Sequence, residues 1–233
     1  RGVTELVTPG VSYNDKVLDH KNNNFLAALV IGEHKCGVSF LDVSTGEFMV
    51  AEGKPEYIDK LLQSFEPKEV LYCRSDRNIF NEKYGRQYYS YMLEDWVFEY
   101  DFASDLLIRH FQVKSLKGFG IEHYHQGVIA AGVVLHYLND TRHDRIGHIS
   151  NLSRIEEERF VWMDRFTVRN LELLYSPNDG AMTLFDVMDR TTTPMGGRLL
   201  KRWISLPLKE KKPILERQEV VHYFHHNNPS ALQ

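Results

Sequence analysis

The sequence predicts an α/β domain followed by a mostly helical one. Short apolar runs that alternate with turn residues fill the first half of the 233-residue chain. Beyond the Gly-Phe-Gly at 118–120, longer segments with apolar residues at helical spacing replace them. The charges divide at the same place. Residues 1–117 carry 14 Lys and Arg against 18 Asp and Glu, whereas residues 118–233 carry 14 of each. We therefore expect one domain at 1–117 and a second at 118–233.

The first domain should open with a meander of three antiparallel strands at 25–31, 37–43 and 47–51. Short loops containing Gly or Ser separate these runs, and such loops join neighbouring strands most easily. A helix is expected at 55–65, with Pro55 in its first turn. The remaining elements expected here are a buried strand at 69–73, a weaker strand at 96–100 and a helix that begins near Ala103.

The second domain should consist mainly of helices. The first, at 122–138, has no Pro, and its Gly127 and Gly132 would let another helix approach closely. Residues 149–162 are expected to be extended around a charged turn at 156–159. Four further helices are predicted: from the cap Asp164 to 175, from the cap Thr183 to 188, from Pro194 to 204, and from near Pro213. Another helix, cut off at Gln233, should follow.

Composition limits the class of protein. Hydrophobic residues make up 42% of the chain and charged residues 26%, as in ordinary globular domains. No uncharged apolar stretch approaches the roughly 20 residues of a membrane-spanning helix, so we expect no membrane association. Cys36 and Cys73 are too few for a disulfide framework and favour a reducing, cytoplasmic setting. The first residues lack an initiator Met and a signal segment, so we expect a piece of a longer protein, truncated at both ends.

The sequence contains no strong motif for nucleotide chemistry. The nearest approach to a phosphate-binding loop, Gly53-Lys54-Pro55, has Pro where a hydroxyl should reach magnesium. A net charge of −4 gives no global signal for nucleic-acid binding. We therefore expect no cofactor site within this chain.

Four acidic residues could instead support a metal-dependent nuclease, in which carboxylates at strand ends hold two magnesium ions. They are Asp42, Glu47, Asp76 and Asp101. The competing interpretation is that Asp42 shapes the turn at 44–46 by hydrogen bonding to it, as Asp commonly does. A stand-alone RNase H-like nuclease remains the alternative function, and a DNA-binding module is a third possibility.

Two histidine groups, at 122–125 and 222–226, lack the pattern of a zinc-peptidase helix and have no nearby Cys. We expect surface histidines at helix ends and no metal site. A basic cluster, formed by Arg190, Arg198, Lys201 and Arg202, is more typical of a solvated helix face or an ion-pair network than of phosphate contacts. Trp203 is expected to belong to the core, because Leu199 lies one turn below it.

Several segments resemble the MutS family of DNA mismatch-recognition ATPases. Residues 183–203 read TLFDVMDRTTTPMGGRLLKRW and resemble the core of that family, and 169–173 read RNLEL. The segments VTELVTPG at 3–10 and LDVSTGEF at 41–48 resemble its connector domain. The matches follow the family's order across nearly the whole chain. The signature residues are Arg169, Asn170, Glu172, Pro194, Met195, Gly196, Arg198, Lys201, Arg202 and Trp203.

The resemblance implies an RNase H-like connector domain followed by the beginning of a helical core and lever domain. In the family, the mismatch-probing Phe-x-Glu lies in an earlier domain and the ATPase in a later one. The resemblance therefore implies no catalytic, cofactor or metal residue in this chain. Phe80-Asn81-Glu82 has the three-residue form, but it lacks the family's surrounding residues, and we interpret it as chance.

The resemblance also implies partners. The longer protein would bind mismatched double-stranded DNA as a homodimer, would use ATP and magnesium, and would recruit MutL through the connector surface. This chain would be a non-catalytic coupling and docking module.

The helix that begins at Pro194 would transmit rigid-body motion between distant sites. It has Gly196 and Gly197 in its first turn, and its expected core anchors are Leu199, Leu200 and Trp203.

Overall fold

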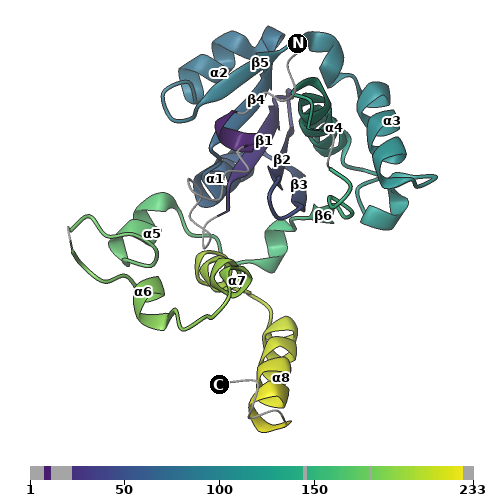
Figure 1. The fold of residues 1–233 in the computed structure, drawn as a ribbon. Helices are drawn as coiled ribbons and strands as arrows, with labels where there is room; N and C mark the ends of the chain where they lie inside the picture. Colours follow the sequence, from purple (N-terminus) through teal and green to yellow (C-terminus); the bar gives the residue numbers. More distant parts are fainter. Residues whose placement is uncertain (1–7, 12–22, 144–145, 179, 228–233) are drawn as a thin grey trace, which may run out of the picture. The chain divides into compact units, whose positions relative to one another are not determined.

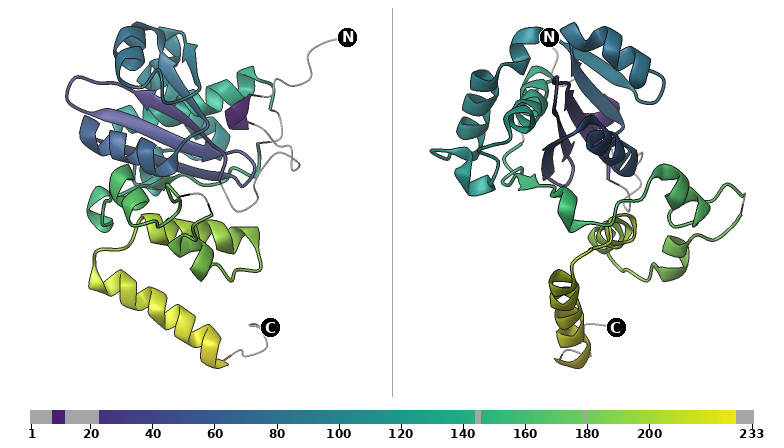
Figure 2. Two further views of the ribbon diagram at one scale, coloured as in Figure 1. Left: turned by 90° about the vertical axis from the view of Figure 1, so that its left-hand side faces the viewer. Right: turned by 180° about the vertical axis from the view of Figure 1, so that it is seen from behind.

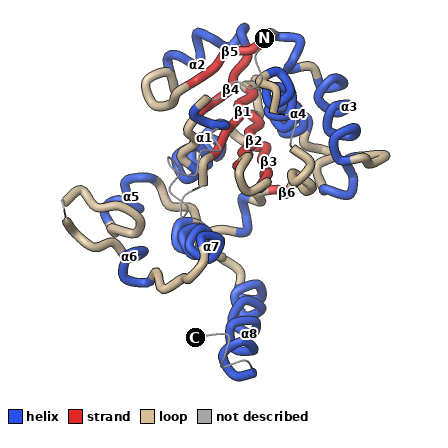
Figure 3. The backbone as a smooth tube through the Cα atoms, in the orientation of Figure 1, coloured by secondary structure: helices blue, strands red, loops and turns tan. Residues whose placement is uncertain are grey.

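The computed structural model describes residues 8–11, 23–143, 146–178 and 180–227 (Figure 1). The chain forms two compact units, Arg1–Ile155 and Glu156–Gln233. All the strands, red in Figure 3, belong to the first unit, and the described part of the second unit is built from helices and loops. The prediction of an α/β domain followed by a mostly helical one is therefore confirmed.

The first unit is built on one mixed sheet. Its strands are β1 (Phe25–Val30), β2 (Cys36–Asp42), β3 (Glu47–Gly53), β4 (Glu69–Cys73), β5 (Ser90–Leu93) and β6 (Ser153–Arg154). They lie in the order β5-β4-β1-β2-β3-β6. The β1–β2 and β2–β3 pairs are antiparallel, which confirms the predicted meander. The pairs β1–β4, β4–β5 and β3–β6 are parallel.

Helices cover both faces of this sheet (Figures 1 and 2). They are α1 (Pro55–Phe65), α2 (Arg77–Lys83), α3 (Tyr100–Phe111) and α4 (His125–Asp140), with short 3-10 turns η1 (Pro9–Val11), η2 (Arg74–Asp76), η3 (Asp95–Phe98) and η4 (Leu116–Phe119). Alternate strand residues serve the two faces. Leu26 and Ala28 join the core beneath α4, whereas Phe40 stacks on Phe65 of α1 at a centroid distance of 4.6 Å. Burial on both faces explains the continuous apolar runs of β1 and β2.

The first unit extends beyond the predicted domain end at residue 117. The predicted boundary between 117 and 118 is wrong because α4 packs against β1, β2 and β3. The Ser39 hydroxyl donates to the Ala130 carbonyl at 2.8 Å, and Glu52 accepts from the amide of Gln126 at 2.7 Å. The α4 helix therefore completes the first core. The charge division is unchanged, since residues 1–155 carry 17 Lys and Arg against 21 Asp and Glu, and 156–233 carry 11 of each.

Local predictions hold best where a strong sequence signal exists. The helix predicted at 55–65 has those bounds in α1, and the strand at 69–73 is β4. The strand expected at 96–100 is wrong: strand β5 ends at Leu93, and 95–98 form the turn η3. Helix α3 begins at Tyr100, before the expected Ala103, and α2 was not anticipated.

The second unit contains the turn η5 (Glu157–Arg159) and the helices α5 (Arg165–Asn170), α6 (Leu184–Met188), α7 (Pro194–Ser205) and α8 (Lys211–Asn227). An isolated antiparallel bridge joins Phe160 to Leu208. Helix α5 ends at residue 170, whereas the sequence suggested 175, because Glu172 adopts a left-handed conformation with a φ of 49°. The further helix expected before Gln233 and most of the motif at 3–10 fall outside the described residues.

Candidate functional site

The four carboxylates of the nuclease hypothesis are not assembled into one site. Asp42 lies at the end of β2 and Glu47 at the start of β3, on one hairpin. Asp76 follows β4, which is parallel to β1 and therefore antiparallel to β2, so Asp76 lies at the opposite end of the strands from Asp42. Asp101 is exposed in the first turn of α3. Among the described residues, no group of three or more His, Cys, Asp or Glu side chains is arranged to hold a metal ion.

Asp42 organises the β2–β3 turn instead. Its side chain is fully buried, and one oxygen accepts from the amide and hydroxyl of Ser44 at 3.0 and 2.6 Å. The other oxygen accepts from the Asn23 amide nitrogen at 2.9 Å and from the backbone of Asn24 at 3.2 Å. Gly46 closes the turn with a φ of 73°, a conformation that costs Gly little. The turn-shaping interpretation of Asp42 is therefore confirmed.

A second buried carboxylate, Glu69 at the start of β4, was missed by the sequence reasoning. It is 0% exposed and accepts hydrogen bonds from the Thr8 hydroxyl, the Gly10 amide at 3.0 Å and the Tyr137 hydroxyl at 2.8 Å. These donors come from the N-terminal segment and from α4. Burial of the Tyr137 ring raises the pKa of its hydroxyl, so this group stays a donor. Glu69 thus joins the first described residues, the sheet and α4.

The signature segment at 183–203 owes its residue pattern to helix caps. The Thr183 hydroxyl accepts from the Asp186 amide at 3.2 Å, and the Asp186 carboxylate accepts from the Thr183 amide at 2.9 Å, which forms a capping box. The Thr193 hydroxyl accepts from Gly196 at 3.1 Å, with Pro194 as the first residue of α7. Both predicted helix starts are confirmed. The residue pattern of this segment therefore has a structural reason in the ends of α6 and α7.

The RNLE segment holds α6 in place. The Leu184 amide donates to the Glu172 carbonyl at 2.8 Å, and Phe185 donates to Leu173 at 3.0 Å. The Glu172 carboxylate also accepts from the Ser176 hydroxyl at 2.7 Å and so closes the loop after α5. The two other signature residues of this segment, Arg169 and Asn170, are exposed.

Helix α7 is less buried than expected. Met195 is 69% exposed and Leu199 is 46% exposed, so the expected anchoring by Leu199 is wrong within the described residues. Gly197 is the buried residue of this helix. The side chains of Arg198, Lys201 and Arg202 are half-buried along it. The structure thus brings the signature residues of α7 together on a helix that still presents apolar side chains to solvent.

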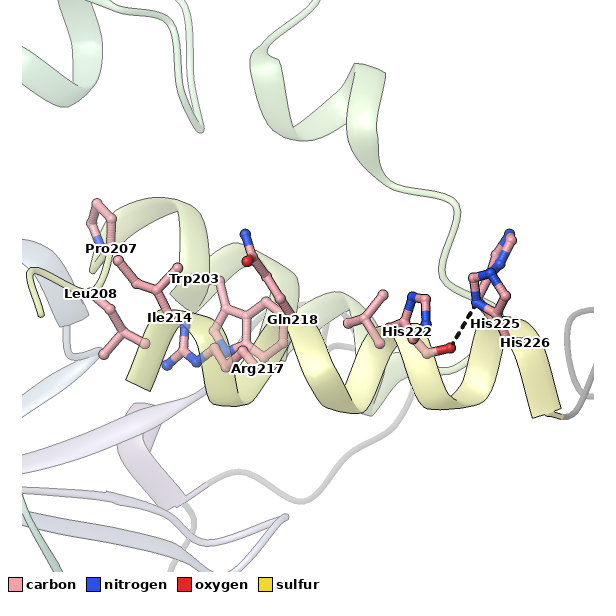
Figure 4. A pocket seen from close by; sticks show the side chains of 10 residues that line it. Trp203, Pro207, Leu208, Ile214, Arg217, Gln218, His222, His225 and His226 are labelled. Carbon is pink, nitrogen blue, oxygen red and sulfur yellow. Dashed lines mark hydrogen bonds between the residues drawn. The ribbon is translucent and has the colours of Figure 1, made fainter. Parts of the chain in front are cut away.

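Trp203 lines a pocket in the second unit, with a volume of about 610 Å³ (Figure 4). The Arg217 guanidinium lies over the Trp203 ring, 4.4 Å from its centroid. The pocket is mainly apolar and lies between the end of α7, the following loop and one face of α8. Its walls are Trp203, Pro207, Leu208, Ile214, Arg217, Gln218, Val221, His222, His225 and His226.

The predicted histidine positions are confirmed. His123 and His125 are exposed at the start of α4, and the ring of His125 stacks on Tyr100. His222, His225 and His226 are exposed in the last turns of α8, where the His226 ring contacts the His222 carbonyl at 3.1 Å (Figure 4).

The second unit exposes many large apolar side chains, which a self-contained domain would bury. They occur on all four helices of the unit and in the loops between them. Those at least 42% exposed are Val161, Phe166, Leu171, Met182, Leu184, Val187, Met188, Met195, Leu199, Leu215, Val220, Val221, Tyr223 and Phe224. In the described part of the chain, no helix combines the length and apolar character needed to cross a bilayer. These side chains therefore indicate surface for further protein contacts.

Phe80, from the Phe-x-Glu look-alike, is fully buried and stacks on Tyr72 at a centroid distance of 3.9 Å. Because a mismatch-probing ring must be exposed, this packing supports the interpretation of the match as chance.

Comparison with known proteins identifies both parts of the chain. Residues 24–150 match the family described as MutS domain II, and residues 166–233 match MutS domain III. A DNA mismatch repair protein MutS from Cytophaga hutchinsonii is 58% identical over 221 residues, which is 95% of this chain and 26% of that protein. The proteins of the same name from Phocaeicola vulgatus and Christiangramia forsetii are each 56% identical, over 96% and 100% of this chain. The chain spans about a quarter of the length of these relatives. It belongs to the MutS family of DNA mismatch repair proteins, and it carries the connector and core domains of that family.

Proposed function

We propose that this chain is the coupling and docking part of a mismatch-repair protein and performs no catalysis itself. The observation that carries the coupling role is the exposed apolar surface of α5–α8, which we assign to contacts with the rest of the longer protein, because contact with further protein is the ordinary use of such a surface. The buried carboxylates support it as well. Asp42 and Glu69 accept structural hydrogen bonds from several donors.

In this proposal, the α/β unit and the helical unit together link two activities of the longer protein. Mismatched double-stranded DNA would be bound by a homodimer, in the cytoplasm, and ATP with magnesium would drive the recruitment of MutL. The printed names of the relatives state only that they are DNA mismatch repair proteins. ATP hydrolysis, dimerisation and MutL recruitment are therefore proposed here for the longer protein, in line with the family resemblance.

We place the MutL contact on the first unit. This unit carries the net charge of −4, which disfavours DNA as its partner and suits a protein with a basic surface. It also exposes Trp96, at 53%, beside Phe102 and His136. Aromatic side chains of this kind are common anchors in protein interfaces.

The test is capture of purified MutL by the immobilised chain. We compare Trp96→Ala, in the first unit, with Met182→Ala, an exposed residue of the second unit. The expected result is capture by the natural sequence and a loss of about tenfold or more in affinity for Trp96→Ala, as for an interface anchor, with no change for Met182→Ala. Absence of capture by a chain shown folded by circular dichroism would count against docking on this chain. Equal loss in both variants would count against the first unit.

A further inference from the structure

The first unit ends in a segment, residues 146–155, that runs along the β3 edge of the sheet; we name it the strap. Figure 1 shows the end of this segment, β6, beside β3. The match to MutS domain II ends at residue 150, and the match to domain III begins at 166. The last five residues of the strap therefore lie between the two family domains, although they complete the sheet of the first unit.

The first part of the strap is firmly anchored. Ile149 and Leu152 are 1% and 2% exposed and belong to the core beneath α4. The His148 ring contacts the Val43 carbonyl at 2.6 Å, and the His110 ring of α3 contacts the Ile149 carbonyl at 2.8 Å. Apolar burial and two side-chain hydrogen bonds thus fix residues 148–152 from both sides.

The last three residues, 153–155, are held differently. Ser153 and Arg154 are both exposed, and they form a strand of only two residues at the edge of the sheet. The Ile155 amide donates to the Val50 carbonyl at 2.9 Å, and the Ile155 carbonyl accepts from the Tyr57 hydroxyl at 3.2 Å. Only the Ile155 side chain is buried here. Edge segments with few apolar contacts open at lower free energy than the core.

We propose that residues 153–155 are a detachable latch on an otherwise fixed strap. In the closed state the latch extends the sheet as β6. In the open state it leaves β3 and Tyr57, and Arg154 loses its contacts with the Gly120 carbonyl and the Tyr124 ring, while Ile149 and Leu152 stay in the core. Three released residues add about 10 Å of extended chain to the connection into the second unit. The latch therefore changes the reach of that connection without unfolding the first unit. This inference concerns the edge of the sheet and holds whether or not the chain docks MutL.

The test is hydrogen exchange of the Ile155 amide in the whole chain, measured by NMR over a range of low denaturant concentrations. Val133 and Val134, buried in α4, report on global opening of the first unit. The Tyr57→Phe variant removes the hydroxyl that holds Ile155 and keeps the ring that packs over Gly53. The matched control is Tyr84→Phe, which removes a hydroxyl that donates to Asp59.

If the latch opens by itself, the exchange rate of the Ile155 amide should depend less on denaturant concentration than the exchange rates of the Val133 and Val134 amides. Tyr57→Phe should make Ile155 exchange about fivefold faster, the effect of losing one hydrogen bond, and Tyr84→Phe should leave it unchanged. If the Ile155 amide exchanges with solvent only through the same global opening as the α4 amides, the strap is a permanent part of the sheet and the proposal is wrong. The same conclusion follows if Tyr57→Phe leaves the exchange of Ile155 unaltered.

Discussion

A side chain at position 132 should destabilise the first unit, because α3 and α4 are in direct backbone contact there. A Cβ atom at position 132 would lie 2.4 Å from the Cβ of Ala103 and 2.5 Å from its Cα. Ordinary contacts between carbon atoms are about 3.5–4.0 Å, so the helices would have to separate by roughly 1 Å. The obstacle includes the backbone of α3, which cannot rotate away as a long side chain could. The clash must therefore be relieved by moving a whole helix.

The magnitude follows from two opposed terms. Ala is favoured over Gly inside a helix by about 1 kcal/mol. Overpacking of a core typically costs about 1–3 kcal/mol, and more when the backbone itself is displaced. Because α4 lies in the middle of the core, we expect Gly132→Ala to lower the free energy of unfolding of the first unit by about 2 kcal/mol.

The assay is urea unfolding of the chain followed by circular dichroism. Gly118→Ala is the matched control, since a Cβ at 118 would meet no atom within 4 Å, and it should change the free energy by less than about 0.5 kcal/mol. Ala103→Gly combined with Gly132→Ala should recover part of the loss, which a double-mutant cycle measures. The reasoning is refuted if Gly132→Ala is neutral or stabilising, because helix propensity alone would then decide the outcome.

Two further predictions concern carboxylates. Glu69→Gln should lower the free energy of unfolding by about 1–3 kcal/mol, because the amide group cannot accept from all three buried donors. Thermal unfolding should show no comparable loss for the exposed Glu82→Gln. The backbone amide and the hydroxyl of Thr183 lower the pKa of the Asp186 carboxyl. The capping box should thus stabilise α6 above pH 4, about the value for unfolded Asp, and lose this effect as the pH falls through the lower folded pKa. An NMR titration that placed the pKa of Asp186 at or above its ordinary value would contradict this.

Helix starts were predictable because their signals are local. Pro55 and Pro194 each open a helix, and the hydroxyls or carboxylates of Asp164, Thr183 and Thr193 cap their helices by bonding to an amide three residues on. Such caps involve only neighbouring residues, so the sequence shows both partners at once. The prediction of a strand at 96–100 was wrong because its signal is not specific. Its apolar residues suit either a strand or a turn, and tertiary packing placed the edge strand at Ser90–Leu93 instead.

The candidate sites divide in the same way. The role of Asp42 in its turn could be predicted, because its hydrogen-bond partner Ser44 is two residues away. The role of Glu69 could not be predicted, because Tyr137 is 68 residues distant and meets it only in the folded unit. The Trp203 pocket depends likewise on the approach of α8 to α7. No local sequence pattern indicates contacts between residues that lie so far apart in the chain.

By itself, the sequence determined the fold class, most helix starts, the meander and the family to which the chain belongs. All of these depend on local patterns or on motifs in a fixed order. Only the tertiary structure decided where the first unit ends. The Ala- and Val-rich helix α4 is apolar on every side, and such a helix can complete either of two cores. Two contacts assign it to the sheet: Ser39 bonds to Ala130, and Glu52 bonds to Gln126. The first unit therefore extends to Ile155.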